Sequence, residues 1–217
     1  MTKRVDIPDG VIVYGAGGHG KVVIDILRKE ERPVACFADE NPALHGRTVN
    51  DVPVLSADDV LRSSEGTEPP REIIIAVGDN GIRCELASLA VSRGFHLAAA
   101  IHPSVQQGAG VQIESGTVLM AGAVVSVDTV IGENVIVNTA ASVDHDCRVD
   151  AGVHVGPGAR ICGGVTLQRG AFIGAGAVVI PGPPVGAGAV VGAGAAVVRN
   201  VPEATTVGGV PARPLHR

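Results

Sequence analysis

Aromatic side chains are scarce in this sequence. Phe, Tyr and Trp make up only 2% of the 217 residues and Trp is absent, whereas glycine occurs 30 times. Globular cores normally use aromatic rings as bulky filler. The interior must therefore be built from Val, Ile, Leu and Ala, which favours a narrow and regular core.

Other absences exclude whole classes of protein. The net charge is −5 without a basic stripe, so we expect no nucleic-acid partner. No apolar run approaches the roughly 18 residues of a membrane-spanning helix, so we expect no membrane partner. The opening residues, MTKRVDIPDG, lack the apolar core of a signal peptide. Together these features predict a cytoplasmic protein.

The cysteines show no metal-binding or redox spacing. Cys36, Cys84, Cys147 and Cys162 form no C-x-x-C pair, so no metal is expected. Free cysteine behaves as a small hydrophobic residue. We interpret all of them as reduced, packed thiols.

The first part of the chain alternates between strand and helix patterns. Continuous apolar runs predict strands over residues 10–15, 33–39, 72–79 and 96–102. Apolar residues at helical spacing predict helices over 20–31 and 81–94. This order predicts an α/β domain over 1–101, with about four strands in a small parallel sheet of Rossmann-like βαβ units.

A period of six residues replaces the helix pattern in the second part. From Ile113 to Val197, every sixth residue is aliphatic in fifteen consecutive cases, which we call the aliphatic positions. Four residues later a small residue is common, as at Ala123, Ala141, Cys147, Ala159, Ala171, Ala177, Ala189 and Ala195. Glycine often follows the aliphatic position directly, as at Gly132, Gly156, Gly174, Gly186 and Gly192.

This repeat is typical of a parallel β-helix. Each six-residue unit forms one flat face, with the aliphatic side chain inside and glycine or asparagine permitting the corner. Three faces form a triangular coil, so fifteen units predict about five coils stacked at roughly 4.8 Å. We therefore expect a second domain over residues 102–217, which includes the C-terminal tail.

The motifs that interrupt these patterns resemble a known family. Hexads of the form [LIV]-G-x-x-[AV]-x mark the left-handed β-helix acyltransferases, which depart from the right-handed crossover rule. Four further motifs occur in order: YGAGGHGKVV, AVGDNGIR, VNTAASVDHDC and VGGVPAR. Over residues 11–213 the chain is similar to bacterial acetyltransferases of nucleotide-linked 4-amino-6-deoxy sugars and to related sialic-acid O-acetyltransferases.

The resemblance implies that the α/β domain binds a nucleotide-sugar. The sequence GAGGHG fits the dinucleotide fingerprint, in which glycines let the backbone approach a phosphate at a helix N-terminus. About four predicted strands leave room for only one nucleotide unit. The expected substrate-binding residues are Gly15, Gly17, Gly18, His19, Asp39, Glu40, Gly78, Asp79 and Asn80. The role of Arg83 is left open: it could contact a pyrophosphate or cover the surface.

The segment SVDHDC carries the expected chemistry. His145 falls outside the inward positions, and histidine is the usual base for deprotonating an amine. The resemblance implies that Asp146 orients its ring, which requires a turn at this point because adjacent strand residues face opposite ways. We expect Asn138 beside His145, as a sugar ligand or a corner residue. Cys147 occupies an inward position, which argues against a role of its thiol as the nucleophile.

The resemblance also implies acetyl-CoA as co-substrate and a homotrimer with active sites between subunits. His154 of an adjacent chain would line the site of His145. A backbone N–H would hold the thioester oxygen, and Gly163 is our candidate by its position in the sequence. Gly163, Ala175 and Ala193 would border the pantetheine.

The expected function is acetyl-CoA-dependent N-acetylation of a nucleotide-linked 4-amino-4,6-dideoxy sugar, for surface polysaccharide or glycan synthesis. The sequence does not distinguish UDP, GDP and dTDP carriers. The alternatives are a sialic-acid O-acetyltransferase, an NAD-dependent oxidoreductase and a non-catalytic solenoid. Pro183 stands where alanine is usual and has no functional interpretation.

Overall fold

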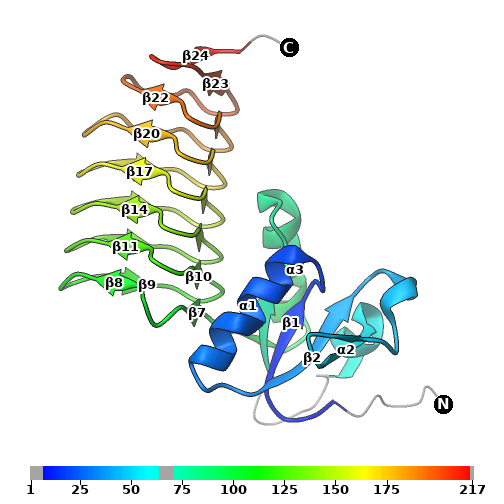
Figure 1. Cartoon of the computed structure of the whole chain (residues 1–217). Helices are drawn as coiled ribbons and strands as arrows, with labels where there is room; N and C mark the ends of the chain where they lie inside the picture. Colours follow the sequence, from blue (N-terminus) through cyan, green and yellow to red (C-terminus); the bar gives the residue numbers. More distant parts are fainter. Residues whose placement is uncertain (1–6, 64–70, 216–217) are drawn as a thin grey trace. The chain divides into compact units, whose positions relative to one another are not determined.

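The computed structural model describes residues 7–63 and 71–215, and the chain forms two compact units (Figure 1). The first unit is Met1–Ala100 and the second is Ile101–Arg217. Within the described residues, no helix is long and apolar enough to cross a membrane.

The first unit contains a six-stranded sheet in the order β3-β4-β2-β1-β5-β6. All neighbours pair in parallel except β3 and β4, which are antiparallel. The strands are β1 (Val11–Tyr14), β2 (Val34–Asp39), β3 (Thr48–Val49), β4 (Val52–Ser56), β5 (Glu72–Ile75) and β6 (His96–Leu97). The helices are α1 (Gly18–Lys29), η1 (Pro42–Leu44), α2 (Ala57–Ser63) and α3 (Asn80–Ser92).

The predicted strand count of about four was wrong. The β3–β4 hairpin was missed, although Asn50 and Asp51 both have positive φ, as a two-residue hairpin turn requires. Pro53 lies within β4 and weakens the strand pattern. The predicted strand 96–102 is two strands, because the chain leaves β6 at Leu97 and begins β7 (Ala100–Ile101) in another sheet.

Strand β1 lies between β2 and β5, and the strand order reverses at this position. The chain runs from β1 to β2 on one side, and later reaches β5 on the other. Ligands of open α/β sheets bind where the strand order reverses, at the carboxyl ends of the strands. The loops that follow β1, β2 and β5 therefore meet at the place where a ligand is expected.

The second unit is a left-handed parallel β-helix with three faces (Figure 1). Face 1 contains β7, β10 (Val118–Leu119), β13 (Ile136–Val137), β16 (His154–Val155), β19 (Phe172–Ile173), β21 (Val190–Val191), β23 (Thr206–Gly208) and the antiparallel β24 (Arg213–Pro214). Face 2 contains β8 (Gln106–Gln107), β11 (Val124–Val125), β14 (Ser142–Val143), β17 (Arg160–Ile161), β20 (Val178–Val179) and β22 (Ala196–Val197). Face 3 contains β9 (Gln112–Ile113), β12 (Val130–Ile131), β15 (Arg148–Val149) and β18 (Thr166–Leu167).

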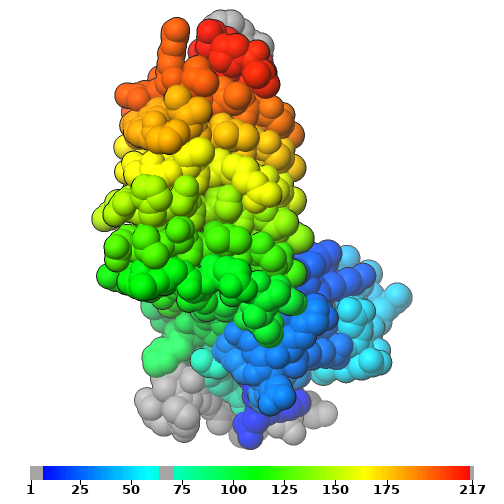
Figure 2. Space-filling model, turned by 60° about the vertical axis from the view of Figure 1, so that its left-hand side comes forward, coloured from blue at the N-terminus to red at the C-terminus, as the bar shows by residue number. Residues whose placement is uncertain are grey.

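The aliphatic positions form the core, as predicted. Every one from Leu119 to Val197 is at most 1% exposed, and only Ile113, in the first described coils, is partly buried. Successive coils stack these side chains in register, for example Val137 beside Val155 and Val155 beside Ile173. The coils appear as successive bands from green to red in Figure 2.

Glycine takes the left-handed backbone of the corners at a different position from the predicted one. The left-handed backbone lies three residues after the aliphatic position, at Gly116, Gly152 or Gly176 for example, and not directly after it. Gly156 and Gly174, which do follow directly, are needed because a Cβ there would touch the backbone of the next coil. Two separate glycine requirements therefore repeat along the helix.

Face 3 weakens near the C-terminal end. After β18 it continues only as isolated bridges from Leu167 to Val185 and from Val185 to Val201. Pro183 and Pro184 precede Val185, and proline has no N–H to donate to a ladder. Pro184 stands opposite Thr166, one residue before the Leu167–Val185 bridge, so its missing N–H shortens this strand, whereas Pro183 lies on the turn before it.

Candidate active site

His145 lies on the turn that joins β14 of face 2 to β15 of face 3. Its Nδ1 is 2.8 Å from Oδ2 of Asp146, so the shorter aspartate does reach the ring. Asp146 has φ +56°, a left-handed conformation that aspartate adopts more readily than most residues. This turn is what lets two adjacent side chains meet.

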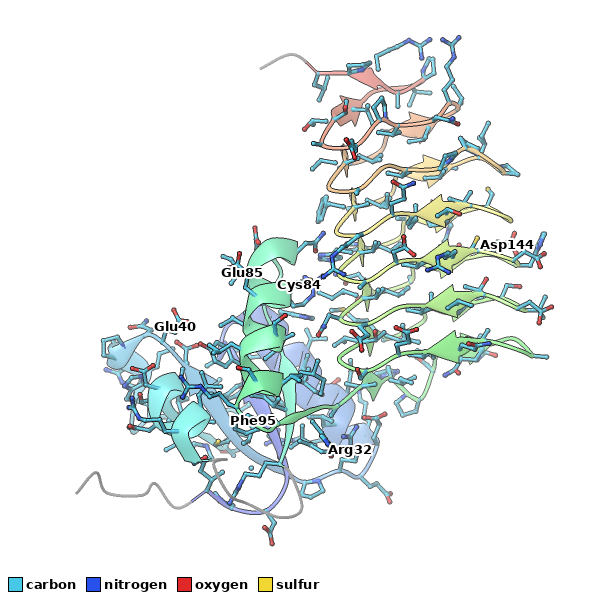
Figure 3. The ribbon with its side chains drawn as sticks, turned by 180° about the vertical axis from the view of Figure 1, so that it is seen from behind. Arg32, Glu40, Cys84, Glu85, Phe95 and Asp144 are labelled. Atoms are coloured by element: carbon cyan, nitrogen blue, oxygen red, sulfur yellow. The ribbon has the colours of Figure 1, made fainter. Side chains whose placement is uncertain are left out.

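Acidic groups surround the imidazole. The pKa of His145 is raised, first by the hydrogen bond that its ring donates to Asp146 and then by the negative charge of Asp144. The Asp144 carboxylate also accepts a hydrogen bond from the backbone N–H of His145 at 2.8 Å. Figure 3 shows Asp144 at the outer tip of its coil, and the side chain of His145 is 54% exposed. An exposed imidazole held through Nδ1 is arranged to act through Nε2.

Gly163 lies one coil further on, directly against this ring. A Cβ at Gly163 would be 2.6 Å from both Cε1 and Nε2 of His145. Gly163 is not in the left-handed region, so the backbone does not require glycine here. Its absent side chain makes room for the imidazole. The N–H of Gly164 also donates to the carbonyl of His145 at 2.9 Å.

Asn138 contacts His154 and not His145. Its Nδ2 is 3.1 Å from Nε2 of His154, whose ring packs edge-on against Phe172 with centroids 5.2 Å apart. Asn138 lies on the turn between faces 1 and 2, and His145 on the turn between faces 2 and 3. The expectation that Asn138 lies beside His145 was wrong, because the hexad count does not reveal which corner each turn occupies.

The small residues expected at the coenzyme are divided between the same two corners. Ala175 and Ala193 are exposed on successive turns between faces 1 and 2. Gly163 lies with His145 on the corner between faces 2 and 3. One copy of the chain therefore presents two separate groups of candidate residues, one at each edge of face 2.

In the α/β unit, the glycines fall into two classes. Gly15 has φ +102°, and a Cβ on Gly20 would collide with the carbonyl of Gly15, so both are required by the fold. A Cβ on Gly17, Gly18 or Gly78 would meet nothing within 4 Å, and none has a left-handed φ. These three glycines leave the backbone exposed at the carboxyl ends of β1 and β5, although the fold does not require glycine at any of them.

Asp39 and Glu40 hold the glycine loop in place. Asp39 accepts a hydrogen bond from the N–H of Ala16 at 2.8 Å and another from the N–H of Asn41. Glu40 accepts from the hydroxyl of Tyr14 at 2.8 Å, and burial raises the pKa of that phenol. Tyr14 was not predicted as a site residue, although it is the one tyrosine of the sequence and directly precedes the loop.

The loop after β5 is also supported from within. Asp79 caps α3 by accepting from the N–H of Ile82 at 2.9 Å. Arg83 is 1% exposed and donates to the carbonyls of Val77 and Gly78 and to the side chain of Asn80. Burial lowers the pKa of Arg83 to about 10. Arg83 therefore supports this loop from within. This role differs from both the pyrophosphate contact and the surface position that the sequence left open.

His19 lies half-buried in the first turn of α1, between the bare glycines and Gly20. Within residues 7–63 and 71–215, no group of three His, Cys, Asp or Glu side chains is placed to hold a metal ion. The four cysteines are free thiols, as predicted, and Cys147 is buried.

Comparison with known proteins gives consistent matches. The profile of the PglD N-terminal domain matches residues 10–89. A perosamine N-acetyltransferase from Caulobacter crescentus, solved with CoA and GDP-perosamine and with one histidine replaced by asparagine, has a TM-score of 0.93. It is 40% identical over 98% of this chain and 100% of that chain. No curated protein sequence matches.

Two further solved structures cover almost the whole chain. The acetyltransferase domain of PglB from Neisseria gonorrhoeae, in complex with acetyl coenzyme A, has a TM-score of 0.87 and 39% identity over 94% of this chain and 98% of that chain. WeeI from Acinetobacter baumannii has a TM-score of 0.85 and 32% identity over 94% of this chain and 99% of that chain.

Proposed function

Since this chain belongs to the hexapeptide-repeat family of nucleotide-sugar acetyltransferases, we propose that it transfers the acetyl group of acetyl-CoA to the 4-amino group of a nucleotide-linked 4-amino-4,6-dideoxy sugar. The observation that carries the proposal is the His145–Asp146 pair on an exposed turn of the β-helix. A product of this kind would serve the assembly of a surface glycan.

His145 is the general base of the proposed reaction. Its Nδ1–H donates to Asp146, so Nε2 is free to accept a proton from the sugar amine. The amine nitrogen attacks the thioester carbon, and the proton passes to Nε2. The tetrahedral intermediate then collapses, the C–S bond breaks, and the proton moves to the sulfur to give the CoA thiol. No covalent acyl-enzyme is needed.

The backbone N–H of Gly163 is the proposed donor to the thioester oxygen. Within the described residues this N–H donates to no backbone carbonyl, and Gly163 lies against the ring of His145. A fixed donor aimed at developing negative charge contributes roughly 3–4 kcal/mol to transition-state stability. Asp146 keeps the imidazole in the tautomer and direction that this geometry requires.

The α/β unit is proposed to bind the nucleotide end of the acceptor. Gly17, Gly18 and Gly78 are bare without structural need, which suits close approach by a phosphate and ribose. Asp39, Glu40, Asp79 and Asn80 shape the loops around this place, and His19 lies beside it. The relative from Caulobacter crescentus was solved with a GDP-linked sugar, so GDP is the first carrier to test, before UDP and dTDP.

The coenzyme site is proposed to lie between copies of the chain in a homotrimer. His145 and Gly163 lie at one corner of the prism, whereas Asn138, His154, Ala175 and Ala193 lie at another. A second copy that brings its other corner to His145 would complete the site. Both proposed substrates are charged metabolites, which is consistent with a cytoplasmic enzyme.

The test is a matched screen of GDP-, UDP- and dTDP-linked 4-amino sugars with acetyl-CoA, following release of the CoA thiol. We expect turnover with one of these acceptors and none with free sialic acid. Acetylation of sialic acid alone would favour the O-acetyltransferase alternative. Tight binding of NAD without any acetyl transfer would favour the oxidoreductase.

A further inference from the structure

The turn that carries His145 is closed differently from seven turns at the other two corners of the β-helix. In seven turns the fourth residue is alanine, and its N–H donates directly to the carbonyl of the first residue at 3.0–3.2 Å. These fourth residues are Ala123, Ala141, Ala159, Ala171, Ala177, Ala189 and Ala195. In the turn from Asp144 to Cys147, a side chain from the preceding coil stands between the two groups.

That side chain is Thr129. Its Oγ1 donates to the carbonyl of Asp144 at 2.6 Å and accepts from the N–H of Cys147 at 3.1 Å. Thr129 is fully buried, so its hydroxyl is shielded from solvent and meets both ends of the turn. The hydroxyl group is therefore inserted where alanine-type turns have a direct backbone hydrogen bond.

The same column continues into the next coil. The thiol of Cys147 donates to the carbonyl of Cys162 at 3.2 Å, on the turn that carries Gly163. Burial raises the pKa of Cys147, which keeps the thiol protonated and able to donate. Thr129 and Cys147 thus support the two successive turns that place His145 and Gly163 against each other.

We propose that Thr129 is a positioning residue for the His145–Asp146 pair. By holding the carbonyl of Asp144 and the N–H of Cys147 apart, its hydroxyl fixes the backbone from which both side chains project. Without the hydroxyl, the carbonyl of Asp144 and the N–H of Cys147 lose the partner that they share, the turn relaxes, and the two side chains leave in altered directions. The catalytic consequence rests on the proposed function, but the effect on the His145–Asp146 contact does not.

The chain contains a matched control for this inference. Thr117 is equally buried, and its Oγ1 donates to the carbonyl of Gly132 at 2.8 Å and accepts from the N–H of Val135 at 3.2 Å. The turn it supports carries Glu133 and Asn134 and no histidine. Removing either hydroxyl disturbs one turn in the same way, but only Thr129 supports the candidate site.

The experiment compares Thr129→Ala, Thr129→Ser and Thr117→Ala. Alanine is native at the equivalent position of seven turns, so both alanine variants should fold, with similar losses of Tm. We expect kcat to fall about 10- to 100-fold in Thr129→Ala with little change in either KM, because the base is misaligned. Thr129→Ser should restore most of kcat, and Thr117→Ala should retain it. If Thr129→Ala does not fold, Thr129→Val replaces it.

A second readout does not depend on turnover. The pKa of His145 is measured by NMR titration of the free protein, with His145→Ala to assign the signal. The charged groups that face the ring are Asp146 and Asp144. Asp128 occupies the equivalent left-handed position one coil earlier. In Thr129→Ala the pKa of His145 should fall toward the ordinary histidine value, and in Thr117→Ala it should not change.

The outcomes separate the two proposals. Wild-type kcat and an unchanged pKa of His145 in a folded Thr129→Ala variant would overturn the positioning role, as would equal losses of kcat in Thr117→Ala. A fall in the pKa of His145 in Thr129→Ala, in a protein that transfers no acetyl group to any acceptor, would support the positioning role and reject the proposed function alone.

Discussion

Glycine marks the candidate site in opposite ways in the two units. In the β-helix it recurs at the corners, and the site lies where the left-handed corner holds Asp146 instead, with His145 beside it. In the α/β unit, Gly17, Gly18 and Gly78 are present although neither φ nor packing requires them. Asp128, Asn134 and Ala140 also replace glycine at left-handed corners, so in the repeat the site is marked by the histidine beside the corner, whereas in the α/β unit it is marked by glycine without a structural reason.

The largest expected effect tests the histidine beside the corner. His145→Ala should lower kcat by about 100-fold or more, the scale expected for losing a general base, because no group remains to deprotonate the amine. The measurement is thiol release at saturating substrates. The control is His96→Ala, which changes an exposed histidine on β6 and should keep wild-type turnover.

A second pair of variants separates a side-chain clash from backbone strain at one turn. Gly163→Ala should lower kcat about 10- to 100-fold, because its Cβ would push the ring of His145 out of place. Gly164→Ala meets nothing within 4 Å but has φ +70°, so it should lose about 1–2 kcal/mol of stability and keep its activity when folded. Equal kinetic losses would contradict this account.

A third pair sharpens the comparison in the α/β unit. Gly18→Ala should raise KM for the nucleotide-linked acceptor about tenfold, or ~1.4 kcal/mol, because a ligand can no longer approach the bare backbone. Its thermal stability should not fall, since alanine favours a helix. Gly20→Ala should instead destabilise the fold by about 1–3 kcal/mol or more, because it collides with the Gly15 carbonyl. Unchanged KM in Gly18→Ala would remove the loop from substrate binding.

The smallest expected effect is a shift in pH dependence. His145 must be neutral to accept a proton, so kcat/KM should rise with pH through the pKa of the free enzyme. Asp146 raises that pKa, and Asp146→Asn should therefore move the midpoint to lower pH. Asp128→Asn, at the matching left-handed corner one coil earlier, is the control and should leave the midpoint in place.

The β-helix could be predicted almost residue by residue. Each aliphatic position meets its equivalent in the next coil, so one local pattern determines every contact, as for Val137, Val155 and Ile173. The α/β sheet could be predicted only in part. Pro53 obscures β4, and α2 is too short to show a helical period, so both depend on contacts that are distant in sequence.

The candidate site was predictable in its residues but not in its contacts. His145 was identified from residue type and position and Asp146 from the family resemblance, and the hydrogen bond between them is present. The pairing of Asn138 with His154 and the hydroxyl of Thr129 inside the turn depend on neighbouring coils. Thr129 was missed, although a threonine at the fourth position of a turn, where alanine is common, is a sequence signal that could have indicated its hydroxyl.

The central claim is that the turn at His145 forms an amide on a nucleotide-linked amino sugar. The most direct measurement is the structure of the product, by NMR and mass spectrometry, after incubation of wild-type protein and His145→Ala with acetyl-CoA and a GDP-linked 4-amino sugar. We predict an acetamide at C4 with the wild-type protein and almost none with the variant. An acetyl ester on a hydroxyl group, or equal amide formation by both proteins, would contradict the claim.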